Sequence, residues 1–201
     1  MNDQTVYLVA PSRDFRSNVL SISKAVTTMH LLNYRTAILS GSYNSIIKAR
    51  NGMIDSIKEL GDTRRIVRAW LMDDDNQIEA PIKDLVDGIK YADENKISIA
   101  AGYPRQDGQS TIVLSKRLDE KISDRDMENL QPFQKIFGAG FGCYYGDVYT
   151  DYTFHSTETH KKYTSEDYFY FMDHPQIDLR YWKIPVSHFK ETRIIHSMWR
   201  K

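Results

Sequence analysis

Three consecutive aspartates, Asp73, Asp74 and Asp75, come directly after the apolar run IVRAWLM at residues 66–72. Like charges in adjacent positions repel, so water, a neighbouring helix end or a bound cation has to offset them. Alternate residues of an extended segment point to the same side, so Asp73 and Asp75 can converge on one object. Two converging carboxylates suit a hard cation such as Mg²⁺ or Mn²⁺. The competing interpretation is a solvated acidic turn ahead of the helix that Pro81 opens.

The surrounding pattern predicts the elements that position these aspartates. Four β-prone runs are expected to form strands, at residues 5–10, 35–40, 66–72 and 96–102. Three segments of helical periodicity lie between them, at about 17–32, 46–60 and 81–89. This alternation is the βαβ rhythm of a parallel sheet under helices. Ligands of such sheets bind at the carboxyl ends of the strands, where the aspartates are expected to lie.

The second half of the chain departs from this rhythm. Strands are predicted at 111–115 and 183–189, an extended glycine-spaced segment at 138–149, and a helix at 164–172. The charged stretch 116–130 is interpreted as a surface loop or a short helix. We expect one α/β domain over residues 1–201, with a Rossmann-like half at about 1–102 and a mixed half at about 103–201.

Composition narrows the class of protein. Basic and acidic residues number 27 each, which argues against nucleic-acid binding by bulk electrostatics. The single cysteine, Cys143, cannot form an internal disulfide, and no run of about 18 apolar residues predicts a membrane span. The N-terminus does not read as a secretory signal, so a cytoplasmic protein is expected. The phosphate-loop motif G-x-x-x-x-G-K-[ST] does not occur, which disfavours P-loop NTPases.

Four segments together resemble the GT-A glycosyltransferase superfamily. The stretch IIKARNGMIDSIKELGDTRRIVRAWLMDDDNQI, residues 46–78, is similar to its nucleotide-sugar core, in which Ala-Arg-Asn on a helix precedes the strand that delivers a DxD motif. GAGFGCYYGDVY at 138–149 resembles the acceptor-side segment, TSEDYFYFM at 164–172 the Glu-Asp helix start, and IPVSHF at 184–189 the strand whose histidine completes the metal site. The resemblance implies a single-domain GT-A fold with a mixed central sheet flanked by helices. The short chain further resembles a small viral member from an archaeal host, which would place it in the host cytoplasm.

The resemblance also implies roles for the residues on the donor side. Asp75 would ligate Mn²⁺ or Mg²⁺, and His188 would complete the metal site. Asp73 would lie near the ribose or the metal, with Asp74 beside it in the nucleotide-sugar site. Arg50 would reach the diphosphate or order the acidic loop, and its alternative is an exposed helix arginine. Pro11, Ser12 and Arg13, after the first strand, would seat the base and the ribose, and their alternative is an ordinary strand-to-helix turn.

An inverting transfer needs a carboxylate that accepts the proton of the acceptor hydroxyl. Asp167 and Glu166 are the candidates that the resemblance implies, and Asp151, after the glycine-rich segment, is another. Thr164-x-x-Asp167 also matches a capping box, so Asp167 can instead secure a helix start. A retaining enzyme would need no such base. Four tyrosines offer rings for stacking on sugar or for the core, namely Tyr144, Tyr145, Tyr149 and Tyr152.

The sequence thus predicts a metal-dependent glycosyltransferase that moves a sugar from a nucleoside diphosphate sugar to a hydroxyl acceptor on a glycan or a protein. A nucleotidyltransferase on a similar sheet is the first alternative, although the turn APSRDF lacks the glycines that this class often carries. The second alternative is a binding protein that has kept the fold without the chemistry. The oligomeric state is not predicted.

Overall fold

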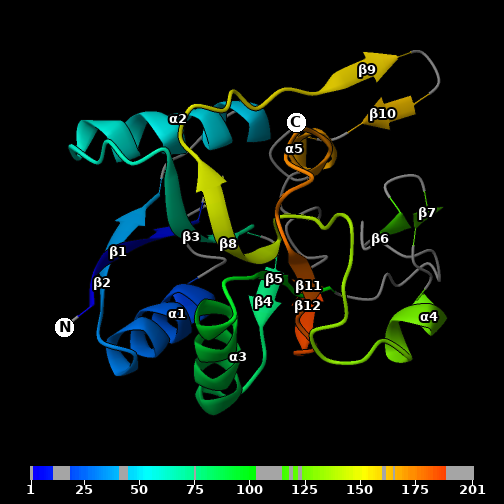
Figure 1. Cartoon of the computed structure of the whole chain (residues 1–201), viewed down its shortest axis with the longest axis horizontal. Coiled ribbons are helices and arrows are strands. Elements are labelled where there is room, and N and C mark those ends of the chain that lie inside the picture. Colours follow the sequence, from blue (N-terminus) through cyan, green and yellow to red (C-terminus); the bar gives the residue numbers. More distant parts are fainter. Residues whose placement is uncertain are drawn as a thin grey trace, which may run out of the picture.

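The computed structural model describes residues 2–10, 19–40, 45–74, 76–102, 115–117, 120–121, 124–159, 162–164 and 166–188. A six-stranded sheet with the order β11-β5-β8-β3-β1-β2 forms the centre of the fold. Helices α1 and α3 cover one face of this sheet, and α2 and α5 lie on the other (Figure 1). The predicted α/β class with a mixed central sheet flanked by helices is confirmed.

The first half follows the predicted alternation of strands and helices. The order is β1 (Asn2–Val9), α1 (Val19–Leu31), β2 (Tyr34–Leu39), α2 (Ile46–Glu59), β3 (Ile66–Met72), α3 (Ile82–Glu94) and β5 (Ser98–Ala100). Strand β1 pairs in parallel with β2 on one side and with β3 on the other. Gly61, with φ +80°, follows the end of α2 in the left-handed conformation that glycine adopts without strain.

The second half contributes strands that the sequence pattern did not predict as part of this sheet. Strand β8 (Cys143–Tyr149) lies between β3 and β5 and is antiparallel to both. Strand β11 (Leu179–Tyr181) extends the sheet in parallel with β5. The first four strands therefore all run in the same direction, as predicted, but an antiparallel strand from later in the chain separates β3 from β5.

Small elements complete the described part of the chain. Strand β4 (Asn76–Ile78) pairs with β12 (Val186–His188), β6 (Ser115–Arg117) with β7 (Glu120–Lys121), and β9 (Thr157–Thr159) with β10 (Lys162–Thr164). Helix α4 (Asp124–Glu128) lies in the predicted charged stretch, and α5 (Glu166–Asp173) follows β10. No helix among these described elements has the length and apolar character needed to cross a membrane.

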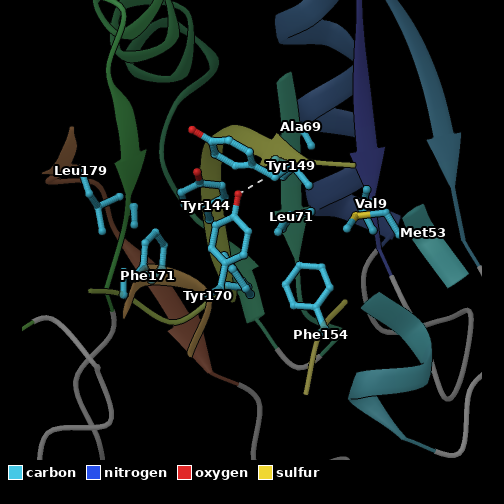
Figure 2. Packing of buried hydrophobic residues seen from close by; sticks show 14 of the residues in the cluster. Val9, Met53, Ala69, Leu71, Tyr144, Tyr149, Phe154, Tyr170, Phe171 and Leu179 are labelled. Carbon is cyan, nitrogen blue, oxygen red and sulfur yellow. Dashed lines mark hydrogen bonds between the residues drawn. The ribbon is translucent and has the colours of Figure 1, made fainter. Parts of the chain in front are cut away.

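Each face of the sheet has its own apolar core. The face toward α1 and α3 packs around Trp70 and Trp182, whose ring centroids lie 5.6 Å apart. The face toward α2 and α5 is rich in aromatic rings. Figure 2 shows this layer extending from Leu179 past Phe171 to Phe154. Both sides of β3 are therefore shielded from water, and the strand can hold its carboxyl end in a fixed position.

The tyrosines of β8 belong to these cores. Tyr144 and Tyr145 are fully buried, and Tyr149 is 7% exposed. The Tyr144 hydroxyl donates to the Asp147 carbonyl at 2.8 Å, and the Tyr145 hydroxyl donates to the Asp93 carboxylate. The core interpretation is confirmed for these three residues, and their role as sugar-stacking rings is wrong.

Candidate functional site

Arg50 and Asp73 form the centre of a charged cluster at the carboxyl end of β3. The Arg50 side chain is fully buried and extends from α2 to Asp73, where Nη2 donates to Oδ1 at 2.5 Å. The Asp73 side chain remains 30% exposed. Its backbone N–H donates to the Gly142 carbonyl at 3.2 Å, which fixes the residue beside the start of β8. The exposed-arginine interpretation of Arg50 is therefore wrong, and these contacts fit a role in ordering the acidic loop.

The acidic loop is a turn rather than a continuation of the strand. β3 ends at Met72, and the Asn76 N–H donates to the Asp73 carbonyl at 3.3 Å, which closes the chain on itself. Asp74 is half-buried within this turn, and Asp75 lies outside the described residues. Asp73 therefore lies in a turn rather than in the strand, and its predicted convergence with Asp75 stays a prediction.

The Arg50 guanidinium also connects the acidic loop to α5. Its Nε lies 3.9 Å from Glu166 Oε1, and its carbon Cζ lies 5.2 Å from the centroid of the Phe141 ring. Nε and Nη1 find no hydrogen-bond partner among the described residues. A buried guanidinium with unused N–H donors favours acceptor oxygens around it. Carboxylates from two distant parts of the chain are thereby held around one cation.

Glu166 and Asp167 form the first turn of α5 and are both buried. Burial and, after it, the charge of Asp167 together raise the pKa of Glu166 to about 7, and Arg50 opposes this shift. Asp167 Oδ1 accepts the Tyr168 N–H at 2.7 Å, and a Cβ on Gly140 would lie 3.5 Å from Asp167 Oδ2. Asp167 therefore faces the glycine-rich segment before β8. A carboxyl group with a pKa near neutrality is suited to proton transfer.

The start of α5 bears on the capping box predicted for Thr164 and Asp167. Thr164 is the last residue of β10, and α5 begins two residues later, at Glu166. The N-cap of a helix is the residue directly before its first turn, so Thr164 does not occupy that position. Asp167 accepts the Tyr168 N–H within the first turn of α5, so its structural role at the helix start stays an alternative to proton transfer.

The sheet register brings His188 to the acidic loop at the level of the backbone. β12 pairs antiparallel with β4, and His188 lies opposite Asn76, the residue that follows Asp75. The side chains of His188 and Asp75 are not described. Within the described part of the chain, no three His, Cys, Asp or Glu side chains gather as a metal site would require. The described metal candidates are therefore only part of the predicted set.

The donor chemistry at this turn nevertheless fits a hard cation. Carboxylate oxygens of Asp73 and Asp74 lie at the turn, and such cations take oxygen ligands. The Asn76 amide is 2% exposed, and neither its Oδ1 nor its Nδ2 has a hydrogen-bond partner in the described residues. The turn thus combines carboxylates with a buried amide whose hydrogen-bonding capacity is unused.

Asp151 lies at the other end of the sheet. In the β3–β8 ladder, Met72 is opposite Cys143 and Ile66 is opposite Tyr149, so β8 runs away from the acidic turn. Seven strand residues span roughly 20 Å. Asp151 follows β8 and pairs with Arg65 at 2.7 Å, with its own side chain 54% exposed. We therefore do not retain Asp151 as a base candidate at this site.

Sequence reasoning missed one residue that organises the site. Asn51, next to Arg50 on α2, donates from Nδ2 to the Phe154 carbonyl at 3.1 Å and accepts the Phe154 N–H on Oδ1 at 2.7 Å. This pair of bonds ties the segment after β8 to the helix that carries Arg50. Its only signal in the sequence was its place in the Ala-Arg-Asn motif. The predicted base and ribose site at Pro11, Ser12 and Arg13 lies outside the described residues.

No protein-family model matches the chain, and no curated protein matches it significantly. The fold and the geometry therefore define the molecule by themselves. It is an α/β protein with a buried arginine–carboxylate cluster at the carboxyl end of the central strand β3.

Proposed function

We propose that the chain is a metal-dependent glycosyltransferase that moves a sugar from a nucleoside diphosphate sugar to a hydroxyl of a glycan or protein acceptor. One observation carries the proposal. Arg50 of α2, Asp73 after β3 and the Glu166–Asp167 pair of α5 converge at the carboxyl end of the central sheet. Three elements far apart in the sequence thus place one cation and three carboxylates together.

The position in the sheet supports a ligand-binding role for this cluster. The chain passes from β1 to β2 on one side and later adds β3 on the other side of β1. Such a reversal of strand order marks the edge where open α/β sheets bind their ligands. Asp73 directly follows β3 at that edge. A ligand bound there meets the acidic turn before it meets other charged groups of the cluster.

In this proposal, Asp73, Asp75 and His188 would hold Mn²⁺ or Mg²⁺, and the ion would supply the positive charge that neutralises the diphosphate of the donor. Arg50 keeps the Asp73 carboxylate in place through its Nη2–H. Asp167, beside the backbone of Gly140, accepts the proton of the acceptor hydroxyl. Glu166 also lies close to the positive charge of Arg50. It provides a second carboxylate that can accept a proton next to Asp167.

Isothermal titration with UDP-sugars and GDP-sugars, with and without Mn²⁺, tests the proposal. We expect wild-type protein to bind one donor only when the ion is present. Asp75→Ala and Asp73→Asn are expected to abolish this binding, while Asp87→Asn, an exposed carboxylate on α3, retains it. Asp167→Asn is expected to keep donor binding and to lower transfer at least 100-fold, because it removes the base.

Other results would redirect the assignment. A preference for nucleoside triphosphates would favour the nucleotidyltransferase alternative. If no nucleotide bound in any titration, the result would favour the second alternative, a binding protein that has kept the fold without catalytic activity. Donor affinity that is unchanged in Asp75→Ala, in protein with a wild-type melting temperature, would remove the metal role of the acidic turn.

A further inference from the structure

A pair of accessible aromatic rings lies beside the charged cluster. His155, exposed in the segment that follows β8, packs against Phe169 of α5 with ring centroids 4.6 Å apart and planes tilted by 32°. Phe169 is half-buried and lies three residues after Glu166. Side chains three residues apart on a helix are neighbours, with Cβ atoms about 5–6 Å apart. The ring pair therefore flanks the side of α5 that carries Glu166.

The backbone that carries His155 is held firmly. The preceding residue, Phe154, exchanges two hydrogen bonds with the Asn51 side chain. The Phe154 ring is fully buried and stacks on Tyr170, with centroids 5.4 Å apart and planes within 18°. A ring fixed before its ligand arrives loses little conformational entropy on binding. These contacts therefore preorganise the position of His155 against Phe169.

We propose that His155 and Phe169 form a stacking site for one sugar ring of the acceptor, next to the proton-accepting carboxylates. Calling the ligand an acceptor rests on the proposed function, whereas the sugar-binding site itself does not. A sugar ring presents an apolar C–H face, which suits aromatic rings, and hydroxyls, which suit carboxylates and imidazole nitrogens. Nucleic acid is disfavoured, because basic and acidic residues number 27 each, so the chain has no excess of positive charge for phosphates.

The same contacts explain why the tyrosines do not serve this purpose. The rings of Tyr144 and Tyr145 are closed off within the core. Tyr152 is half-buried, its ring packs edge-on against Phe154 and Tyr170, and its hydroxyl donates to Asp173 at 2.9 Å. Phe169 is half-buried as well, but His155 beside it is exposed. The stacking function that the sequence placed on β8 is thus reassigned to the following segment and to α5.

Saturation-transfer NMR with maltotriose, mannotriose and chitotriose, each at millimolar concentration, tests the site. We expect wild-type protein to bind at least one of them, and His155→Ala and Phe169→Ala to weaken that binding at least tenfold. Phe169→Leu keeps an apolar side chain but removes the ring, so it is expected to lose binding while the protein stays folded. The matched control is Tyr91→Ala. Tyr91 lies on α3, and its ring stacks on that of Phe133 with 4.1 Å between the centroids. Removal of the Tyr91 ring is expected to leave trisaccharide binding unchanged.

The outcomes separate this inference from the proposed function. Equal binding by Phe169→Leu and Tyr91→Ala, or no binding of any trisaccharide, would overturn the stacking site. Binding of single-stranded DNA that depends on Phe169 would overturn it as well, in favour of a nucleobase site. Trisaccharide binding that depends on Phe169, in a protein that binds no nucleotide sugar, supports the site and contradicts the proposed transfer.

Discussion

At the scale of single residues, the buried guanidinium of Arg50 determines how charge is arranged in the cluster. It hydrogen-bonds to Asp73, approaches Glu166 to 3.9 Å and lies over the Phe141 ring. A planar fork can meet all three groups, whereas a lysine ammonium is a point charge that cannot stack in the same way. Arg50 is thus the residue through which the acidic turn and α5 interact electrostatically.

Glu166 is expected to make stability depend on pH. Its pKa rises from 4.5 to about 7 in the folded protein, first by burial and then by the charge of Asp167. The folded state therefore keeps a proton that the unfolded chain releases. The stabilisation is complete below the unfolded value and is lost as pH rises through about 7.

Glu166→Gln cannot ionise, so the variant is expected to be more stable than wild type at about pH 8, by on the order of 3 kcal/mol. At about pH 4.5 the two proteins are expected to unfold at similar urea concentrations. Urea unfolding followed by circular dichroism at both pH values measures this difference. Asp87→Asn is the control, because it removes an exposed carboxylate of α3 in place of the buried one. A difference of equal size at both pH values would contradict the ionisation of Glu166 as its cause.

A residue of the site was predictable where the residues that fix its position lie close to it in the sequence. Arg50 and Asp167 were indicated by the resemblance of short segments to GT-A motifs, and Asp73 by its place directly after a predicted strand. The sequence did not indicate at which end of the sheet Asp151 lies. Its position depends on the direction of β8, which is set by pairing with residues about 80 positions earlier in the chain.

At the scale of elements, the helices and strands of the first half were predictable, because each follows its own hydrophobic period. Strand β3 was predicted with the observed bounds, Ile66–Met72. The strands β4 and β11 were not predicted. Each has three residues, too few to show a period, and each is defined by backbone pairing with a distant partner.

Gly88 tests how closely α3 packs on the sheet. Glycine within a helix normally lowers stability by about 0.5–1 kcal/mol relative to alanine. Here a Cβ would lie 2.3 Å from Trp182 Nε1, and that ring is 2% exposed and cannot move aside freely. Overpacking costs about 1–3 kcal/mol, which exceeds the helical gain.

Gly88→Ala is therefore expected to lower the free energy of unfolding by about 1–2 kcal/mol. Thermal unfolding measures the change. The double variant Gly88→Ala/Trp182→Phe has a smaller ring at the contact, so the alanine is expected to cost less in that background than in wild type. A stabilising effect of Gly88→Ala in the wild-type background would show that α3 shifts to make room.

At the scale of the whole molecule, the two ends of the sheet carry different charged networks. Opposite the acidic turn, Arg68 of β3 donates to Asp93 at 2.7 Å, to Asp147 at 3.0 Å and to the Ile97 carbonyl at 2.9 Å. Asp93 also accepts the Tyr34 hydroxyl at 2.6 Å. This network joins helix α3 to strands of both halves, and its groups bond to each other, so we interpret it as structural.

Arg68→Met is expected to lower the free energy of unfolding by about 1–3 kcal/mol, because it leaves the half-buried carboxylates of Asp93 and Asp147 without their buried cation. Arg68→Lys keeps the charge and is expected to lose less. In Arg68→Lys, the affinity for the nucleotide sugar should equal that of wild type, since the network lies at the other end of the sheet. Urea unfolding and donor titration on the same samples measure both quantities. A parallel loss of affinity would show that the two ends of the sheet are coupled.

The position of β8 has a consequence for synthesis of the chain. Strand β5 pairs only with β8 and β11 among the described strands. No strand pairing therefore connects β5 to β3 until β8 is present. As the polypeptide leaves the ribosome, the first hundred residues can form β1, β2 and β3 but cannot complete the sheet. The position between β3 and β5 is filled only after β8, which ends at Tyr149, has left the ribosome. If the gene were divided at the junction of the two halves, the two fragments would therefore have to associate before the six-stranded sheet could form.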